Sequence, residues 1–200
     1  INILYKGNKL EKYDCVYIRG SYKYTMLQRS ITTALYEEIY TPFKSETFTL
    51  AHNKFLTLLR LQKHKVNVTQ TYLVATVDSA KKLLEKVNYP IIFKIPYGTH
   101  GKGVTFADSL ASAKSILDTL EISKQPYIIQ EYIESESTDI VDVRAIVIGN
   151  KVAAAMKRVA TPEEHRANIH MGGKGIAYEL DYDTEQLAVK AAKAIGADIC

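Results

Sequence analysis

Long hydrophobic runs, a set of paired cysteines and a strong excess of one charge are all missing from this 200-residue sequence. No apolar run approaches the roughly 18 residues that a membrane span needs, and the first residues lack the apolar core of a signal peptide. Two cysteines, Cys15 and Cys200, are too few for a disulfide framework, which favours a reducing, cytoplasmic compartment. The net charge of +4 suits an anionic ligand but gives little support for nucleic acid as a partner.

The patterning that is present is that of a mixed α/β chain. Apolar spacing predicts helices over 25–40, 49–64, 79–87, 109–120 and 183–195, and strands over 13–19, 70–76, 104–107 and 126–133. The helix over 49–64 is expected to start at Thr49 or Asn53, and the next two helices at Asp78 and Asp108. The last helix is expected to start at Asp183, which has Gln186 at capping-box spacing, and to end at Gly196. The expected buried faces are Phe55, Leu58, Leu59 and Leu61, then Leu110, Ala113, Leu117 and Leu120, and finally Leu187, Ala191 and Ile195.

A glycine loop interrupts an apolar run in "IIFKIPYGTHGKGVTF", residues 91–106. The stretch lacks the Lys-Ser/Thr of a Walker loop, and it does not open a helix as a dinucleotide fingerprint does. It predicts a strand, a loop and a second strand, with loop N–H groups able to fold over a phosphate. Lys94 lies among apolar neighbours, where an unpaired charge would be costly to bury. A phosphate partner for its ammonium group would explain why a lysine stands there. The alternative is an edge-strand lysine that reaches water before a loose turn.

Residues 142–158 predict a hairpin around the two-residue turn Gly149-Asn150. In the register of such a turn, Asp142 pairs with Lys157, and Arg144 lies beside them at the end away from the turn. These charges can surround an anionic ligand or form an exposed cross-strand ion pair. Arg144 is the first candidate for a substrate contact, because guanidinium groups bind carboxylates and phosphates through two hydrogen bonds.

The segment 163–175, "EEHRANIHMGGKG", has neither helical nor strand periodicity. A metal site at His165 and His170 has no cysteine or carboxylate at ligand spacing. The segment is therefore either a solvated loop or a mobile basic loop that closes over charged substrates.

Taken in order, these pieces resemble the ATP-grasp superfamily, and within it the RimK-type α-L-glutamate ligases. The resemblance covers roughly residues 45 to 200, from "AHNKFLTL" through the glycine loop, "IIQEYIE", the hairpin and "EEHRANIHMGG" to "LAVKAAKAIGADI". It implies an α/β (α+β) chain with the ATP-grasp fold. The implied domains are the remainder of a pre-ATP-grasp domain at 1–48, a small subdomain with the phosphate loop at 49–130, and an incomplete C-terminal subdomain at 131–200.

The resemblance also implies the roles of the site residues. Lys54 and Lys94 would bind the nucleotide phosphates, and residues 130–133 would lie at the adenine. Asp142 would lie near the nucleotide, and Arg144 near the substrate. The implied catalytic set is Arg144, Arg166 and Asn168, and the implied nucleotide-binding set is Lys54, Lys94, Gly98, Gly101, Gly103, Gln130, Glu131, Tyr132, Ile133, Asp142, Lys157, Arg166 and Asn168. No metal ligand is assigned, because those of the family would follow Cys200. The chain is accordingly expected to be truncated at both ends.

The implied activity is ATP-dependent ligation of an amino acid, L-glutamate in the first instance, to an acceptor carboxylate. The reaction would run through an acyl phosphate, with Mg²⁺ or Mn²⁺, and charge developing on the phosphoryl group and on the oxyanion calls for lysine and arginine placed in advance. The acceptor would be a ribosomal protein C-terminus or a cofactor, and a homo-oligomer is compatible with the sequence. The alternatives are a non-catalytic nucleotide-binding or regulatory module, the amino-group-carrier-protein branch of the family, and a nucleic-acid-binding domain, which the small net charge disfavours.

Overall fold

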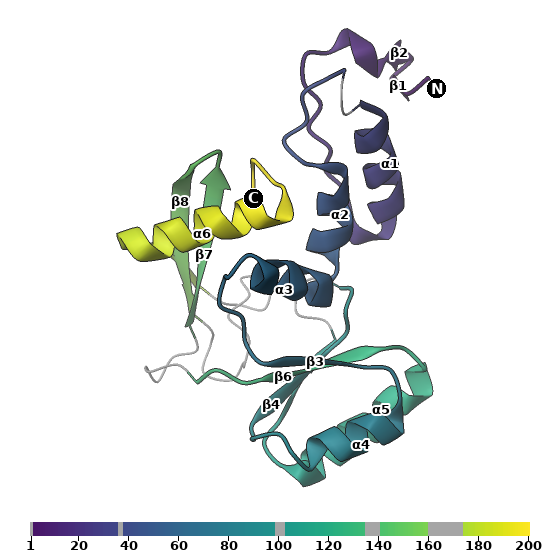
Figure 1. Cartoon of the computed structure of the whole chain (residues 1–200), viewed down its shortest axis with the longest axis vertical. Coiled ribbons are helices and arrows are strands. Elements are labelled where there is room, and N and C mark those ends of the chain that lie inside the picture. Colours follow the sequence, from purple (N-terminus) through teal and green to yellow (C-terminus); the bar gives the residue numbers. More distant parts are fainter. Residues whose placement is uncertain (1, 36–37, 99–102, 135–140, 160–173) are drawn as a thin grey trace. The chain divides into compact units, whose positions relative to one another are not determined.

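The computed structural model describes residues 2–35, 38–98, 103–134, 141–159 and 174–200 (Figure 1). The chain divides into two compact units. Unit 1 comprises residues 1–67, 145–155 and 178–200, and unit 2 comprises residues 68–144 and 156–177. Helices and antiparallel sheets occur in both, as the sequence patterning predicts.

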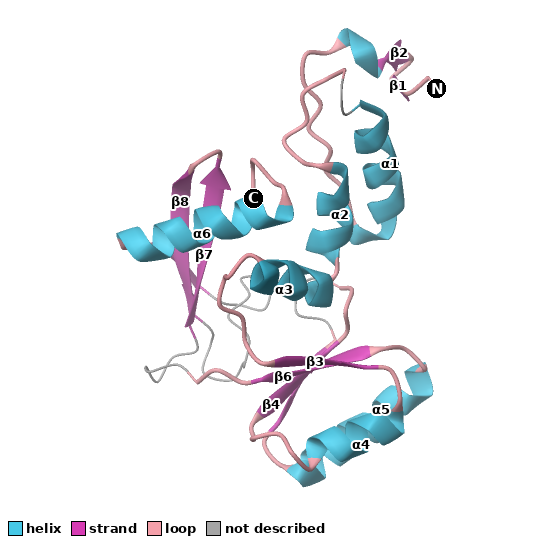
Figure 2. Ribbon diagram, in the orientation of Figure 1, coloured by secondary structure: helices cyan, strands magenta, loops and turns pink. Residues whose placement is uncertain are grey.

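Unit 2 is built on a four-stranded antiparallel sheet in the order β3-β6-β4-β5. Its elements are β3 (Thr71–Val74), α4 (Val77–Leu84), β4 (Ile91–Lys94), β5 (Val104–Ala107), α5 (Leu110–Ser123) and β6 (Tyr127–Glu131). Both helices lie on the same side of the sheet (Figure 2). Ala113 and Leu117 are fully buried against it, with Leu110 and Leu120 packed around them, which confirms the predicted inner face of α5.

Three helices begin one or two residues away from the predicted caps. Thr76 caps α4 in place of Asp78, Ser109 caps α5 in place of Asp108, and Asp181 caps α6 in place of Asp183. Each of these segments holds two neighbouring side chains that can accept the hydrogen bond of a cap, so composition alone does not choose between them. Asp108 accepts hydrogen bonds from two serine hydroxyls, which lower the pKa of its carboxyl group.

Unit 1 contains a small hairpin and four helices. Its elements outside the third sheet are β1 (Leu4–Tyr5), β2 (Asn8–Lys9), two 3₁₀ turns (Leu10–Lys12 and Tyr22–Tyr24), α1 (Thr25–Leu35), α2 (Ser45–His52), α3 (Lys54–Lys63) and α6 (Tyr182–Ile195). The predicted helix over 49–64 is two helices, and Asn53 caps the second by accepting hydrogen bonds from the backbone N–H groups of Phe55 and Leu56. Leu59 is exposed, so the predicted apolar face of α3 is wrong at that residue. The predicted strand at 13–19 is also wrong, since only Cys15 forms a bridge there, to Tyr40.

A third sheet, in the order β7-β8-β9, comprises β7 (Val141–Ile148), β8 (Lys151–Val159) and β9 (Lys174–Ala177). The turn at Gly149-Asn150 is confirmed. Within unit 1, Val147 packs with Val189 and Ala192 of α6. Gly196 ends α6 with a φ of 77°, as predicted, whereas Leu187 is exposed against expectation.

Both cysteines are free, in agreement with the prediction that they form no disulfide framework. Within the described part of the chain, the helices are too short or too polar to cross a membrane.

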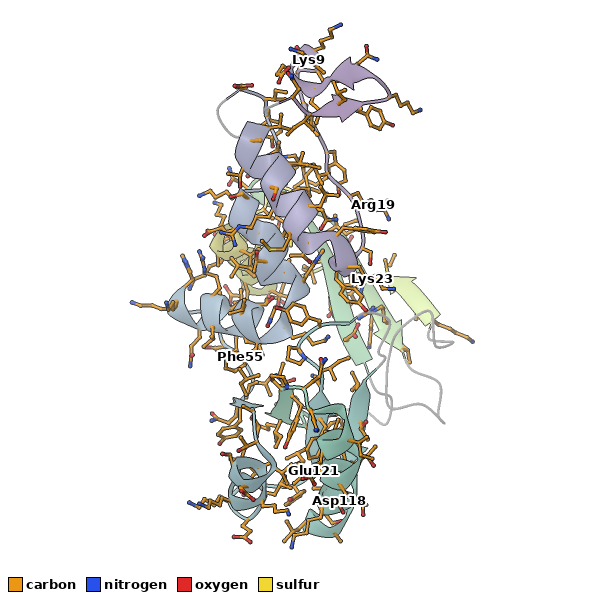
Figure 3. The ribbon with its side chains drawn as sticks, turned by 90° about the vertical axis from the view of Figure 1, so that its right-hand side faces the viewer. Lys9, Arg19, Lys23, Phe55, Asp118 and Glu121 are labelled. Atoms are coloured by element: carbon orange, nitrogen blue, oxygen red, sulfur yellow. The ribbon has the colours of Figure 1, made fainter. Side chains whose placement is uncertain are left out.

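The fold predicts a large difference between two aliphatic residues of α5. Leu117 is fully buried, whereas Ile122 is 82% exposed, and the nearby Asp118 and Glu121 mark the solvent side of this helix (Figure 3). Leu117→Ala should lower the free energy of unfolding of unit 2 by about 3 kcal/mol, because it leaves a cavity. Ile122→Ala should change it by less than about 0.5 kcal/mol. Urea denaturation followed by circular dichroism measures both, and equal effects would contradict this packing.

Candidate functional site

Lys94 is the last residue of β4, directly before the glycine loop. Its neighbour Phe93 is 2% exposed and faces the helices, so strand alternation places Lys94 on the opposite face of the sheet. β4 lies between β6 and β5, and the edge-strand alternative for Lys94 is therefore wrong. The predicted strand, loop and strand are confirmed by the antiparallel pairing of Lys94 with Val104.

The Lys94 ammonium group donates a hydrogen bond to Oε1 of Gln130 in β6. Gln130 is buried, and its Nε2 donates to Oγ1 of Thr71 in β3 over 2.7 Å. Side chains from three adjacent strands, β3, β6 and β4, thus meet on the sheet face opposite α4 and α5. Thr71 was not among the residues that sequence reasoning selected, because a threonine in a strand has no distinguishing pattern.

Two described glycines of the loop have backbone conformations that other residues rarely adopt. Gly98 has a φ of 140° and Gly103 a φ of 71°. A Cβ atom at Gly103 would lie 2.8 Å from the side chain of Ile95, so a side chain there is also excluded by space. The carbonyl oxygen of Gly103 accepts a hydrogen bond from the backbone N–H of Ile95, which closes the base of the loop. Gly101 lies outside the described residues.

Glu131 ends β6, and the chain leaves the sheet at Tyr132 and Ile133. The backbone N–H of Glu131 donates to the carbonyl oxygen of Gln70, and the Tyr132 ring packs edge-on against Phe106 with centroids 5.1 Å apart. Ile133 is 64% exposed. Tyr132 and Ile133 thus form a connector directly after the strand, and the assignment of residues 130–133 to adenine stays a prediction.

A cavity of about 200 Å³ adjoins Glu131. Its lining includes Tyr72, Ile91 and Ile129, which belong to or pack against the helix-covered core. The cavity therefore lies on the helix side of the sheet and not on the face that carries Lys94.

The hairpin presents a bidentate ion pair that sequence reasoning missed. Arg158 donates from Nε and from a terminal nitrogen to the two carboxylate oxygens of Asp142, over 2.5 and 2.6 Å. The ion-pair partner of the Asp142 side chain is therefore Arg158, whereas the predicted strand register that sets Asp142 opposite Lys157 stays a prediction. Arg158 is one residue further along β8 than Lys157, so the pair was not evident from the register that the turn predicts.

Lys54, the first residue of α3, lies in unit 1, whereas Lys94 and the charged end of the hairpin lie in unit 2. The Lys54 side chain is half-buried, and this burial lowers the pKa of its ammonium group. Arg144 is exposed on β7 and Lys157 is half-buried on β8. The joint action of the two lysines on one phosphate stays a prediction.

Arg166, Asn168 and most of the basic segment 163–175 lie outside the described residues. Among the residues that are described, no group of three or more His, Cys, Asp or Glu side chains is placed to hold a metal ion. A role for Mg²⁺ or Mn²⁺ stays a prediction.

Comparison with known proteins gives one consistent result. Residues 51–200 match a family described as the RimK-like ATP-grasp domain. A probable alpha-L-glutamate ligase of Mannheimia succiniciproducens is 36% identical over 95% of this chain, and one of Rhodopirellula baltica is 31% identical over 98%. The chain spans 48% of the Rhodopirellula relative and 63% of the Mannheimia one.

A solved structure supports the fold. The RimK domain protein ATP-grasp from Sphaerobacter thermophilus superposes with a TM-score of 0.68 at 16% identity, covering 92% of this chain and 65% of that one. At that identity the likeness shows the ATP-grasp fold alone, and it confirms the fold class that the sequence motifs imply.

The hairpin ion pair leads to a stability prediction. Asp142→Asn removes the charge that compensates Arg158, whose side chain is only 12% exposed. The free energy of unfolding should fall by about 1–2 kcal/mol, because a partly buried guanidinium loses two charge-assisted hydrogen bonds. Glu46→Gln is the matched control, since the more exposed Glu46–Arg60 pair has a single 3.1 Å contact and should contribute less than about 1 kcal/mol. An equal loss in the two variants would contradict the special role of the Asp142–Arg158 pair.

Proposed function

Because this chain belongs to the RimK-like ATP-grasp family, we propose that it carries the nucleotide-binding part of an ATP-dependent carboxylate–amine ligase. The amino acid added is L-glutamate, in line with the names of the curated relatives. The observation that carries the proposal is Lys94, a cation held on an inner strand, on the sheet face opposite α4 and α5, directly before a loop with two left-handed glycines.

The proposed reaction has two steps that need no side-chain nucleophile. An oxygen of the acceptor carboxylate attacks the γ-phosphorus of ATP, which gives an acyl phosphate and ADP. The amino nitrogen of glutamate then attacks the acyl carbon, phosphate leaves, and the nitrogen loses its proton as the amide forms. Negative charge develops first on the transferring phosphoryl group and then on the tetrahedral oxygen, so cations fixed in advance lower both barriers.

The chain's own residues have distinct proposed roles. Lys94 and Lys54 bind phosphate oxygens, and the backbone N–H groups of the glycine loop add further donors. Arg144 binds the substrate carboxylate, while Arg158 is fixed by Asp142 and shapes the same end of the hairpin. Arg166 and Asn168 contribute at the reaction centre. The acceptor is a protein C-terminus, as in ribosomal protein modification, or the carboxylate of a cofactor.

Replacing Lys94 by alanine tests the nucleotide site directly. Lys94→Ala should reduce ATP binding below detection in titration calorimetry, because it removes a charge-assisted contact to phosphate. The far-ultraviolet circular dichroism spectrum should be unchanged. Lys114→Ala, which alters an exposed lysine of α5, is the control and should bind ATP as the unaltered protein does. Undiminished ATP binding by Lys94→Ala would contradict the role of this lysine.

The ligase chemistry predicts which components phosphate release requires. Release from ATP should need both glutamate and an acceptor carboxylate in an assay of the full-length protein that contains this chain. Candidate acceptors are peptides that end in a free carboxylate and carboxylated cofactors, and mass spectrometry of the acceptor should show the mass of an added glutamyl residue. Phosphate release without either substrate, or nucleotide binding without any turnover, would favour a different activity or a non-catalytic module.

A further inference from the structure

Lys94, Gln130, Thr71 and Thr69 form a continuous chain of hydrogen bonds on one face of the sheet. Lys94 Nζ donates to Gln130 Oε1, Gln130 Nε2 donates to Thr71 Oγ1, and Thr71 Oγ1 donates to the carbonyl oxygen of Thr69 over 2.7 Å. Thr71 and Gln130 are direct partners in the ladder between β3 and β6, so their side chains leave the sheet on the same side. The chain is therefore fixed by the strand register.

The orientation of the Gln130 amide is determined from both of its ends. The Thr71 hydroxyl has one hydrogen, which it gives to Thr69, and it must therefore accept from Gln130, through the amide nitrogen. An ammonium group can only donate, so Lys94 must meet the amide oxygen. Both requirements select the same orientation. Gln130 is 8% exposed, and a lost partner there is not readily replaced by water.

We propose that Thr71 and Gln130 are positioning residues for Lys94. Thr71 fixes the direction of the Gln130 amide, and the amide oxygen holds the ammonium group where it meets the phosphates of bound nucleotide. This rests on the proposed function, and it gives Gln130 a task that differs from contact with adenine. The benefit is preorganisation, because an unrestrained lysine side chain loses up to about 2 kcal/mol of rotamer entropy when it is fixed by a ligand.

The Gln130 amide is suited to holding the Lys94 ammonium group because the amide is uncharged. A carboxylate at residue 130 would also hold the ammonium group, but it would cancel the charge that attracts phosphate. An amide oxygen orients Lys94 and leaves its charge in place.

Titration calorimetry with ADP tests the consequence for binding. Thr71→Val keeps the shape of the side chain but removes the acceptor, and should weaken ADP binding roughly five-fold, the size of one neutral hydrogen bond. Thr71→Ser restores the hydroxyl and should bind as the unaltered protein does. Thr119→Val removes a hydroxyl from the exposed face of α5, which donates only to Ser115 in the helix, and should have no effect. Gln130→Glu should weaken binding by about ten-fold or more even though it holds Lys94 tightly.

Nuclear magnetic resonance of the nucleotide-free protein tests the positioning separately. The Cε–Hε signals of Lys94, identified by their loss in Lys94→Ala, should shift in Thr71→Val but not in Thr71→Ser or Thr119→Val. Unmoved Lys94 signals in Thr71→Val, or equal ADP affinity in that variant and the unaltered protein, would overturn the proposal. Shifted signals in a protein that fails to bind ADP would support the positioning and contradict the proposed function.

Discussion

The alternation of side chains along β4 and β6 is the constraint on which the candidate site depends. One face of these strands packs Ile91, Phe93 and Ile129 into the core beneath α4 and α5, each with at most 2% exposure. Burial of that face fixes the register, because a shift by one residue would turn the side chains of Lys94 and Gln130 into the core. Lys94 and Gln130 are thereby held on the other face by hydrophobic packing to which they contribute nothing. The placement of the candidate site residues is thus a consequence of how the hydrophobic core packs.

The hairpin obeys a different constraint, since polar contacts fix its charged end. The apolar residues near the turn pack with α6, whereas the Asp142–Arg158 pair lies at the opposite end of the two strands. A bidentate carboxylate–guanidinium pair is directional, so it fixes the geometry of both strands as well as neutralising the charges. Asp142 can then act both as an anchor for Arg158 and, as the family resemblance implies, as a group near the nucleotide.

Most of the fold could be predicted from the sequence because its signals are local. The glycine loop between two strands, the Gly149-Asn150 turn and the end of α6 at Gly196 each depend on residues adjacent in the chain. The predictions that fail are those that depend on contacts between residues far apart in the sequence. Tertiary packing leaves Leu187 and Leu59 exposed although their helical spacing resembles that of a buried face. The ion pair of Asp142 with Arg158 was missed because side-chain contacts across a hairpin are not set by the turn alone. Thr71 became apparent only when β3 was paired with β6.

The two positioned cations of unit 2 differ in what their partners do to the electric field around them. The carboxylate of Asp142 compensates the guanidinium of Arg158 at contact distance, so the pair presents little net charge to an approaching anion. The amide of Gln130 carries no net charge, so its hydrogen bond to Lys94 restrains the ammonium group without cancelling its attraction for phosphate. If the proposed nucleotide site is correct, the glycine-loop end of β4 attracts the phosphate group, and the Asp142–Arg158 pair contributes shape more than attraction. A net charge of only +4 is therefore compatible with the proposed phosphate site, because what matters there is the local partner of each cation.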